Sequence, residues 1–170
     1  SNSFYEMSVL DYYSYLFSAT ESHRINVSSV CNNKCSYCYA SPTTPKSNLI
    51  MNTKTADAVV DLLFQFPEKR MLIEFFGGEC LLNYKIIKHI IERVKNKNKT
   101  GKKKILFALM TNLNIFTNEI ISLIKENNII CSTSLDGPSE LHNFHRKTVN
   151  GKDTYTMVKN NIQKAKKKKN

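Results

Sequence analysis

Three cysteines within eight residues are the part of this sequence best suited to chemistry. They lie in the segment Cys31-Asn-Asn-Lys-Cys35-Ser-Tyr-Cys38. Spacings of three and two residues let three thiolates converge on one metal centre and leave one coordination position without a protein ligand. A structural zinc site normally takes four ligands, and the next cysteine, Cys80, is far along the chain. The segment therefore predicts a metal centre with an open position, with zinc kept as an alternative.

A second motif, Phe75-Phe76-Gly77-Gly78-Glu79, ends a short apolar run of strand length. Paired glycines permit a close approach between the backbone and a ligand. The Glu79 carboxylate offers a hydrogen-bond acceptor to a cationic group. Alone, the motif is typical of an ordinary turn, but its place one strand after the thiol loop favours a ligand site. Cys80, the next residue, is interpreted as a small buried hydrophobe.

Polar residues close two further apolar runs. Thr111-Asn112 follows one run, and Ser134-Leu135-Asp136-Gly137-Pro138 follows the other, with His142 and Arg146 beyond it. Arg146 can form a bidentate pair with a carboxylate, a geometry that lysine cannot match. The alternatives are an ordinary turn at Asp136-Gly137 and a surface salt bridge for Arg146.

The elements that position these motifs are predicted from apolar periodicity. Short apolar runs alternate with longer segments of helical period, which favours repeated βα units and a parallel sheet whose carboxyl edge carries the motifs. The candidate strands are Ile25–Val30, Met71–Phe76, Ile105–Met110 and Ile129–Ser134. Helices are expected around the stripes Ala56–Leu63 (behind an Asn52 cap), Ile86–Val94, Ile120–Ile124 and Val158–Ala165.

Length and composition indicate one domain. The chain has 170 residues, 41% of them hydrophobic, and its five cysteines are an odd number that does not suit a disulfide framework. Residues 1–23 are expected to form an N-terminal extension that covers one end of the sheet, and 24–170 the domain itself. No apolar run approaches the roughly 18 residues that cross a bilayer, and no signal-peptide pattern begins the sequence. The prediction is a cytoplasmic protein without a membrane segment.

The chain is strongly basic, with 25 basic and 14 acidic residues and a net charge of +11. Lysines are concentrated in Lys95–Lys104 and Lys166–Lys169. Such a balance can attract nucleic acid, but few aromatic residues are interleaved with the lysines to stack bases. Solvated helix ends and polar connections, at 95–104 and 143–154, are the favoured interpretation, and a peptide substrate with acidic residues is compatible with the charge.

The pattern Cys-x3-Cys-x-aromatic-Cys, with Tyr37 at the aromatic position, resembles the signature of the radical S-adenosylmethionine (radical SAM) superfamily. The resemblance implies that Cys31, Cys35 and Cys38 ligate a [4Fe–4S] cluster whose fourth iron binds S-adenosylmethionine. It also implies a partial parallel (β/α) barrel, with about four of six βα units in this chain. The positions implied to bind the cofactor are Tyr37, Gly77, Gly78, Glu79, Thr111, Asn112, Ser134 and Arg146. Cys80 and Leu113 depart from the family pattern, which has proline and glycine there.

The Ser-x-Asp-Gly-Pro turn and the following His and Arg resemble the branch that modifies peptides and proteins, including anaerobic sulfatase-maturing enzymes and SPASM-type peptide maturases. This implies an oxidoreductase-like enzyme that reductively cleaves S-adenosylmethionine to a 5′-deoxyadenosyl radical. The implied partners are a peptide or protein substrate and an electron donor such as flavodoxin or ferredoxin. The chain is then expected to be the N-terminal, cofactor-binding portion of such an enzyme.

A different class of function stays open beside this one. The alternative is a non-catalytic, basic α/β binding module for nucleic acid or an acidic partner, with zinc in the thiol loop. Of the remaining reactive side chains, His23, His89 and His145 are interpreted as surface or packing residues. Cys131, inside a predicted strand, is expected to be a buried structural thiol.

Overall fold

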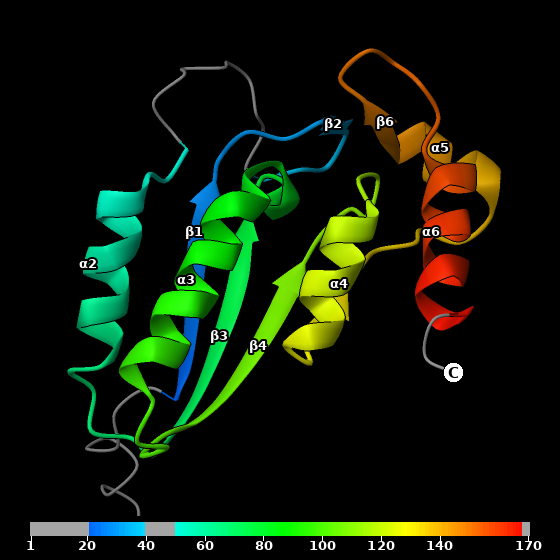
Figure 1. Cartoon of the computed structure of the whole chain (residues 1–170). Coiled ribbons are helices and arrows are strands. Elements are labelled where there is room, and N and C mark those ends of the chain that lie inside the picture. The colour runs from blue at the N-terminus through cyan, green and yellow to red at the C-terminus, as the bar shows by residue number, and fades with distance from the viewer. Residues whose placement is uncertain (1–20, 40–49, 168–170) are drawn as a thin grey trace, which may run out of the picture.

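Four parallel strands form the centre of the molecule in the computed structural model, which describes residues 21–39 and 50–167 (Figure 1). The strands are β1 (Ser22–Ser28), β3 (Arg70–Gly77), β4 (Lys104–Met110) and β5 (Ile130–Ser132). They are hydrogen-bonded in the order β1-β3-β4-β5, and every neighbouring pair is parallel. The predicted α/β fold with a parallel sheet is confirmed, although β5 is shorter than the strand expected at 129–134.

Alternating side chains give the sheet one strongly apolar face. Val27, Ile73, Phe75 and Leu109 are completely buried, and successive side chains of a strand point to opposite faces. These four residues belong to a single core that also includes the buried residues of the neighbouring helices. The apolar runs that predicted the strands therefore supply the alternate buried residues of this core.

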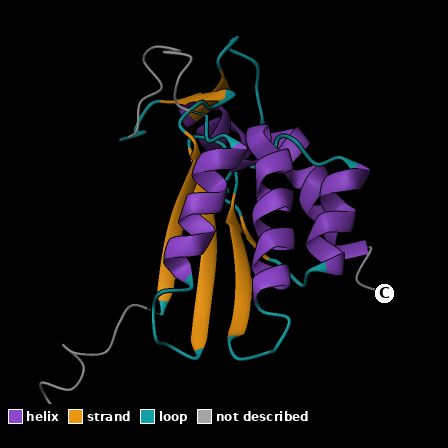
Figure 2. Ribbon diagram, turned by 60° about the vertical axis from the view of Figure 1, so that its left-hand side comes forward, coloured by secondary structure: helices purple, strands orange, loops and turns teal. Residues whose placement is uncertain are grey.

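Three helices cover the apolar face and lie on one side of the sheet (Figure 2). They are α2 (Thr53–Leu63), α3 (Tyr84–Lys97) and α4 (Asn118–Glu126). Asn52 caps α2 as predicted, because its Oδ1 accepts a hydrogen bond of 2.9 Å from the Thr55 N–H. The predicted apolar stripe of α3 is buried along its whole length: Ile86, Ile87, Ile90, Ile91 and Val94.

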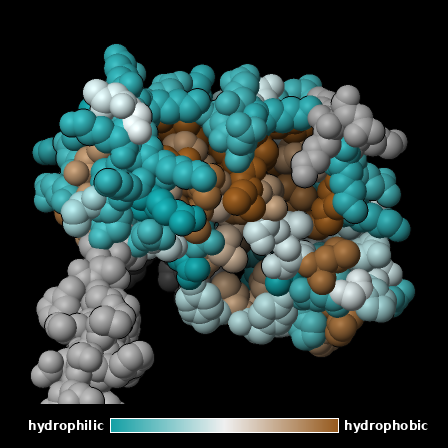
Figure 3. Space-filling model, turned by 90° about the horizontal axis from the view of Figure 1, so that it is seen from below, coloured by the Kyte–Doolittle hydropathy of each residue, from teal (hydrophilic) through white to brown (hydrophobic). Residues whose placement is uncertain are grey.

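The other face of the sheet is more open in the described part of the chain. Arg24 of β1 pairs there with Glu74 of β3, at 2.5 Å between Nε and Oε2. Leu106 and Met110 of β4 and Ile130 of β5 are exposed. The open face of the sheet therefore presents apolar side chains beside an ion pair. In the view from below, which looks along the strands, hydrophobic residues gather in the middle of the molecule with hydrophilic residues around them (Figure 3).

Several elements were not predicted, and most of them lie at the carboxyl edge of the sheet. They are β2 (Asn33–Cys35), the 3₁₀-helix η1 (Cys80–Asn83), α5 (Ser139–His145) and β6 (Arg146–Thr148). The prediction of a polar connection at 143–154 was wrong in part, because this segment contains the end of α5 and all of β6. The last helix, α6 (Tyr155–Lys167), was predicted from its apolar stripe.

The predicted N-terminal extension, 1–23, lies almost entirely outside the described residues. β1 begins at Ser22, so the sheet starts two residues before the expected boundary at residue 24. Among the helices that the structure describes, none is both long and apolar enough to cross a membrane.

Candidate functional site

The cysteine segment leaves the carboxyl end of β1 and runs beside β6. β2 pairs with β6 in antiparallel fashion, which places Cys35 opposite Arg146. Cys31, Cys35 and Cys38 are all half-buried. Burial is the main cause that raises the pKa of Cys31, and the charges of Glu79, Cys35 and Cys38 raise it further. The three predicted ligands therefore share one electrostatic environment.

Hydrogen-bond donors already approach the Cys31 sulfur. Its Sγ accepts from the Asn33 N–H at 3.3 Å and lies 3.7 Å from the Asn112 Nδ2. Such donors stabilise a thiolate. Within residues 21–39 and 50–167, no group of three or more His, Cys, Asp or Glu side chains is arranged to hold a single metal ion. The hydrogen-bond donors at 3.3 Å and 3.7 Å therefore place Cys31 where a thiolate would be stabilised.

Gly77 and Gly78 allow two segments of the chain to approach each other closely. The Gly78 N–H donates to the Ser28 carbonyl at 2.8 Å, and the Glu79 N–H donates to the Val30 carbonyl at 2.9 Å. A Cβ at Gly77 would lie 2.1 Å from the Ser28 oxygen, and a Cβ at Gly78 would lie 2.7 Å from the Val30 oxygen. The close approach that the paired glycines permit is thus made to the backbone that leads into the cysteine loop. Their contact with a ligand stays a prediction.

Glu79 joins the carboxyl ends of β3 and β4. It is 1% exposed, and its Oε1 accepts from the Thr111 hydroxyl at 2.6 Å and from the Leu81 N–H at 3.0 Å. Its Oε2 accepts from the Asn112 N–H at 2.7 Å. Burial raises the pKa of Glu79, and these hydrogen bonds limit the rise. The contact of Glu79 with a ligand ammonium group stays a prediction. The hydroxyl of Thr111 donates its hydrogen to Glu79, and its own contact with the cofactor also stays a prediction.

The segment after β4 is tied to the cysteine loop by side-chain amides. Asn112 Nδ2 donates to Asn32 Oδ1 at 2.7 Å, and Asn114 Nδ2 donates to Asn33 Oδ1 at 2.6 Å. Leu113, between the two donors, has a φ of +58°, in the left-handed region that glycine adopts most easily. The departure from glycine at this position is therefore accommodated at the cost of backbone strain.

Two half-buried residues at this edge each leave one polar atom without a hydrogen-bond partner in the described structure. They are Asn114, through its Oδ1, and Thr133, through its Oγ1. Buried polar groups are normally paired, so such atoms indicate where a ligand or water completes the structure. Leu113, beside Asn114, is held from the other direction because its carbonyl accepts a hydrogen bond of 2.8 Å from Asn161 of α6.

Tyr37 and Arg146 both bind the carboxylate of Asp136. Arg146 Nε donates to Oδ1 at 2.8 Å, and the Tyr37 hydroxyl donates to Oδ2 at 2.5 Å. The guanidinium also lies 5.3 Å from the centre of the Tyr37 ring. Burial opposes the ionisation of Asp136, but these hydrogen bonds hold its pKa below the ordinary value. Arg146 thus forms a partly buried salt bridge, and Ser134, in the same turn, is exposed.

His142 connects this turn to Thr154, the residue that precedes α6. Its Nδ1 accepts from the Asp136 N–H at 3.3 Å, which leaves Nε2 as the protonated nitrogen of the neutral ring. Nε2 lies 3.0 Å from the Thr154 hydroxyl, which donates in turn to the Arg146 carbonyl at 2.5 Å. Burial lowers the pKa of His142. A neutral imidazole therefore fixes the turn after β5 against β6.

His145 contacts the cysteine loop, although only surface or packing contacts were expected for it. Its Nδ1 is 2.7 Å from the Ser36 hydroxyl, and its carbonyl accepts from the Ser36 N–H at 2.9 Å. Further residues that frame the site were absent from the predicted set: Asn32, Asn33, Asn114, Asp136 and His142. Only the last two carried a sequence signal, the turn motif, because the asparagine contacts join residues distant in the chain.

The two remaining cysteines lie apart from the loop. Cys80 is completely buried, as expected, and its Sγ donates to the Met110 carbonyl at 3.2 Å. Cys131 is exposed, so the prediction of a buried structural thiol was wrong. The reason is that β5 lies at an edge of the sheet formed by the described residues, where it pairs with β4, and all three of its residues are exposed.

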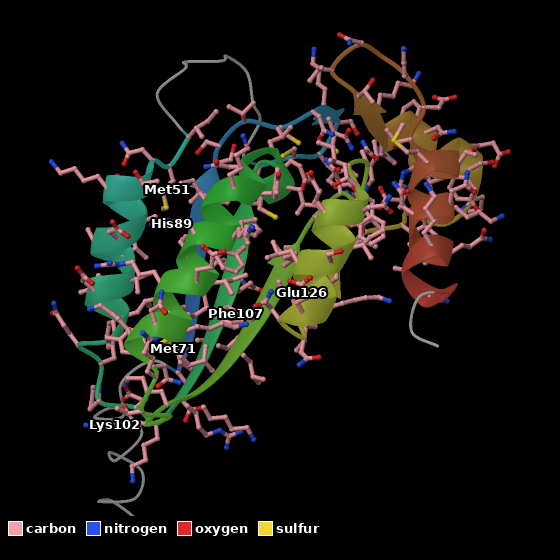
Figure 4. The ribbon with its side chains drawn as sticks, viewed as in Figure 1. Met51, Met71, His89, Lys102, Phe107 and Glu126 are labelled. Atoms are coloured by element: carbon pink, nitrogen blue, oxygen red, sulfur yellow. The ribbon has the colours of Figure 1, made fainter. Side chains whose placement is uncertain are left out.

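A separate ion-pair network links α2 and α3 on the outer side of the helices. Arg93 pairs with Asp57 at 3.0 Å and with Asp61 at 2.9 Å, and His89 lies 2.8 Å from Asp57. His89 is thus a packing residue. Figure 4 shows it along α3, and Lys102 at the end of the sheet opposite to β2 and β6. The lysine-rich turn is therefore remote from the cysteine loop.

Comparison with known proteins agrees with this geometry. The family model of the Radical SAM superfamily matches residues 25–170. The cysteine-type anaerobic sulfatase-maturating enzyme of Clostridium perfringens (strain 13 / Type A) is 29% identical over 136 residues, which are 77% of this chain and 36% of that protein. The radical SAM cyclopropyl synthase TigE of Paramaledivibacter caminithermalis is 28% identical over 151 residues, which are 81% of this chain and 30% of that protein.

The fold of this chain is also similar to that of a solved structure. The structure of native anSMEcpe with bound AdoMet and Kp18Cys peptide superposes with a TM-score of 0.78 at 29% sequence identity. The match covers 87% of this chain and 41% of that one. The chain therefore spans less than half the length of the proteins it matches.

Proposed function

The chain belongs to the radical SAM superfamily, and we propose that it is the cofactor-binding part of an enzyme that cleaves S-adenosylmethionine reductively. The observation that carries the proposal is the cysteine loop. Three half-buried thiols in one electrostatic environment lie at the carboxyl edge of a parallel sheet. Parallel α/β folds place their ligand sites at this edge.

The residues present fit a [4Fe–4S] cluster and its nucleotide ligand. Cys31, Cys35 and Cys38 would hold three irons, and the other two cysteines, Cys80 and Cys131, lie outside the loop and leave the fourth iron without a protein ligand. The unpaired polar atoms at the ends of β4 and β5 are available to the polar groups of the nucleotide. When bound and reduced, the cluster supplies the electron that breaks a carbon–sulfur bond of S-adenosylmethionine.

The chain's own residues position the loop rather than react. Glu79 holds the end of β4 against β3 and so presents Asn112 to the Cys31 sulfur. Asp136 holds Arg146, which faces Cys35 across the β2–β6 pair. Positioning of this kind is the protein's contribution when a cofactor performs the chemistry. Direct cofactor contacts of Tyr37, Gly77, Gly78, Glu79, Thr111, Asn112, Ser134 and Arg146 belong to the same proposal.

We further propose a peptide or protein as the substrate and a reduced electron-transfer protein as a partner, in the cytoplasm. The peptide substrate is supported by the similarity to sulfatase-maturating enzymes and to anSMEcpe, which was solved with bound AdoMet and Kp18Cys peptide. The open face of the sheet, with Leu106, Met110 and Ile130 exposed, offers an apolar surface beside the site.

Alanine substitution of the loop cysteines tests the proposal. Cys35→Ala is expected to abolish cluster absorbance after anaerobic reconstitution with iron and sulfide, and 5′-deoxyadenosine formation with it. The fold should persist, because Cys35 lies in a half-buried loop outside the core. Cys131→Ala, an exposed cysteine in β5, is the matched control and should retain both signals. A zinc-loaded, iron-free protein, or equal signals from the two variants, would contradict the assignment.

A further inference from the structure

The β2–β6 ribbon, residues 33–35 and 146–148, carries an unfavourable arrangement of charge. Lys34 and Lys147 are directly opposite each other in its register, and both are exposed. Like charges at opposite positions destabilise a pair of strands, and two strands of this length have little intrinsic stability. An anionic partner would turn this local cost into favourable binding energy.

The surroundings of the two lysines are also basic. Residues 31–39 and 146–152 contain four basic residues and no acidic one: Lys34, Arg146, Lys147 and Lys152. Arg146 is neutralised by Asp136, whereas the three lysines are exposed. Val149, next to the ribbon, is 55% exposed. An exposed apolar residue two positions from Lys147 and three from Lys152 fits an acidic protein surface that also offers an apolar contact.

The ribbon also connects this patch directly to the cysteine loop. Lys34 and Cys35 are consecutive residues of β2, so their side chains point to opposite faces of the ribbon. Lys34 is exposed, whereas Cys35 is half-buried. A protein seated on the lysine face would therefore be separated from a proposed cluster ligand by the thickness of one strand.

We propose that the β2–β6 ribbon is the docking surface of an acidic electron-carrier protein. This inference rests on the proposed function. One electron leaves the reduced carrier, which is oxidised, and reaches the metal group held by the cysteines; no bond in this chain forms or breaks. Electron-transfer complexes bury little surface and rely on charge complementarity, so a patch of three lysines and one apolar residue is sufficient.

Charge reversal on the ribbon tests the proposal, with a flavodoxin as the acidic carrier used. Lys34→Glu places opposite charges across the ribbon and should stabilise it, so weaker docking by this variant cannot come from unfolding. The single substitution Lys34→Glu should weaken the binding of fluorescently labelled, oxidised flavodoxin by about tenfold or more at low salt. Lys102→Glu, at the opposite end of the sheet, makes the same single charge change and should bind like the unmodified chain (Figure 4).

Two reductants then separate this inference from the proposed function. With reduced flavodoxin, the Lys34→Glu protein should form 5′-deoxyadenosine about tenfold more slowly than the Lys102→Glu control, whereas dithionite should drive both equally. Unchanged flavodoxin binding, or equal slowing with both reductants, would overturn the docking surface and leave S-adenosylmethionine cleavage standing. No product with dithionite from the unmodified protein would overturn both.

Discussion

The core beneath α2 and α3 and the edge that carries the cysteine loop are stabilised by different interactions. In the core, fully buried apolar residues such as Ile73 and Phe75 pack against a helix whose inner stripe is equally buried. At the edge, Glu79, Asp136 and His142 hold chain segments together through hydrogen bonds to backbone and side-chain groups. The stability of the core therefore depends on how well buried side chains fill its volume. The stability of the edge depends on the pairing of individual hydrogen-bond donors and acceptors.

The largest expected effect is in the core. Phe75→Ala removes a completely buried ring and should lower the free energy of unfolding by about 3–5 kcal/mol through lost burial and a cavity. Phe144→Ala, where the ring is 72% exposed, should change it by less than about 0.5 kcal/mol. Urea denaturation followed by circular dichroism measures both. Similar losses for the two variants would break the distinction between core and edge.

A backbone contact at the edge should come next. In Gly77→Ala the new Cβ would meet the Ser28 oxygen at 2.1 Å, so a loss of about 3 kcal/mol is expected from overpacking together with an unfavourable φ. Gly101→Ala has a positive φ of +66° but nothing within 4 Å, and should cost about 1 kcal/mol. The same denaturation experiment compares them. Equal losses would show that φ alone, and not the close approach, makes glycine necessary.

A hydrogen-bond substitution at the edge should have a smaller and local effect. Thr154→Val removes the hydroxyl between His142 and the Arg146 carbonyl and should cost about 1–3 kcal/mol, because both groups lose a partner. Hydrogen exchange should accelerate in α5 and β6 and stay unchanged in α3. Thr156→Val, at an exposed position of α6, is the control. Acceleration throughout the sheet would show that core and edge unfold as one unit.

The smallest effect concerns pH. Because burial lowers the pKa of His142 in the folded chain, the unfolded chain binds this proton more readily. Stability is therefore complete above the ordinary histidine pKa of about 6.5 and falls as pH decreases through it, by at most about 1.4 kcal/mol per pH unit. Unfolding measured from pH 7.5 to pH 5.5 should show this slope. His142→Gln should flatten it, and an unchanged slope would assign the dependence to other groups.

The difference between the core and the edge that carries the cysteine loop also explains which elements could be predicted from the sequence. The strands of the core follow from short apolar runs and its helices from stripes of helical period. Cys31, Cys35 and Cys38 were identified from their spacing, and their role as metal ligands stays a prediction. β2 and β6 could not be found, because each strand has only three residues without an apolar run, and their partners are distant in the chain. Periodicity also gave no reason to expect β5 to stop at Ser132, and so it misplaced Cys131.

The contact between the cysteine loop and α5 also sets an order of events during synthesis. Ser36 and His145 are 109 residues apart in the sequence and hydrogen-bonded to each other. Because a ribosome adds about 5–20 residues per second, this contact forms only several seconds after the cysteine loop has been made. The loop therefore reaches its final hydrogen-bonded arrangement late in the synthesis of this chain.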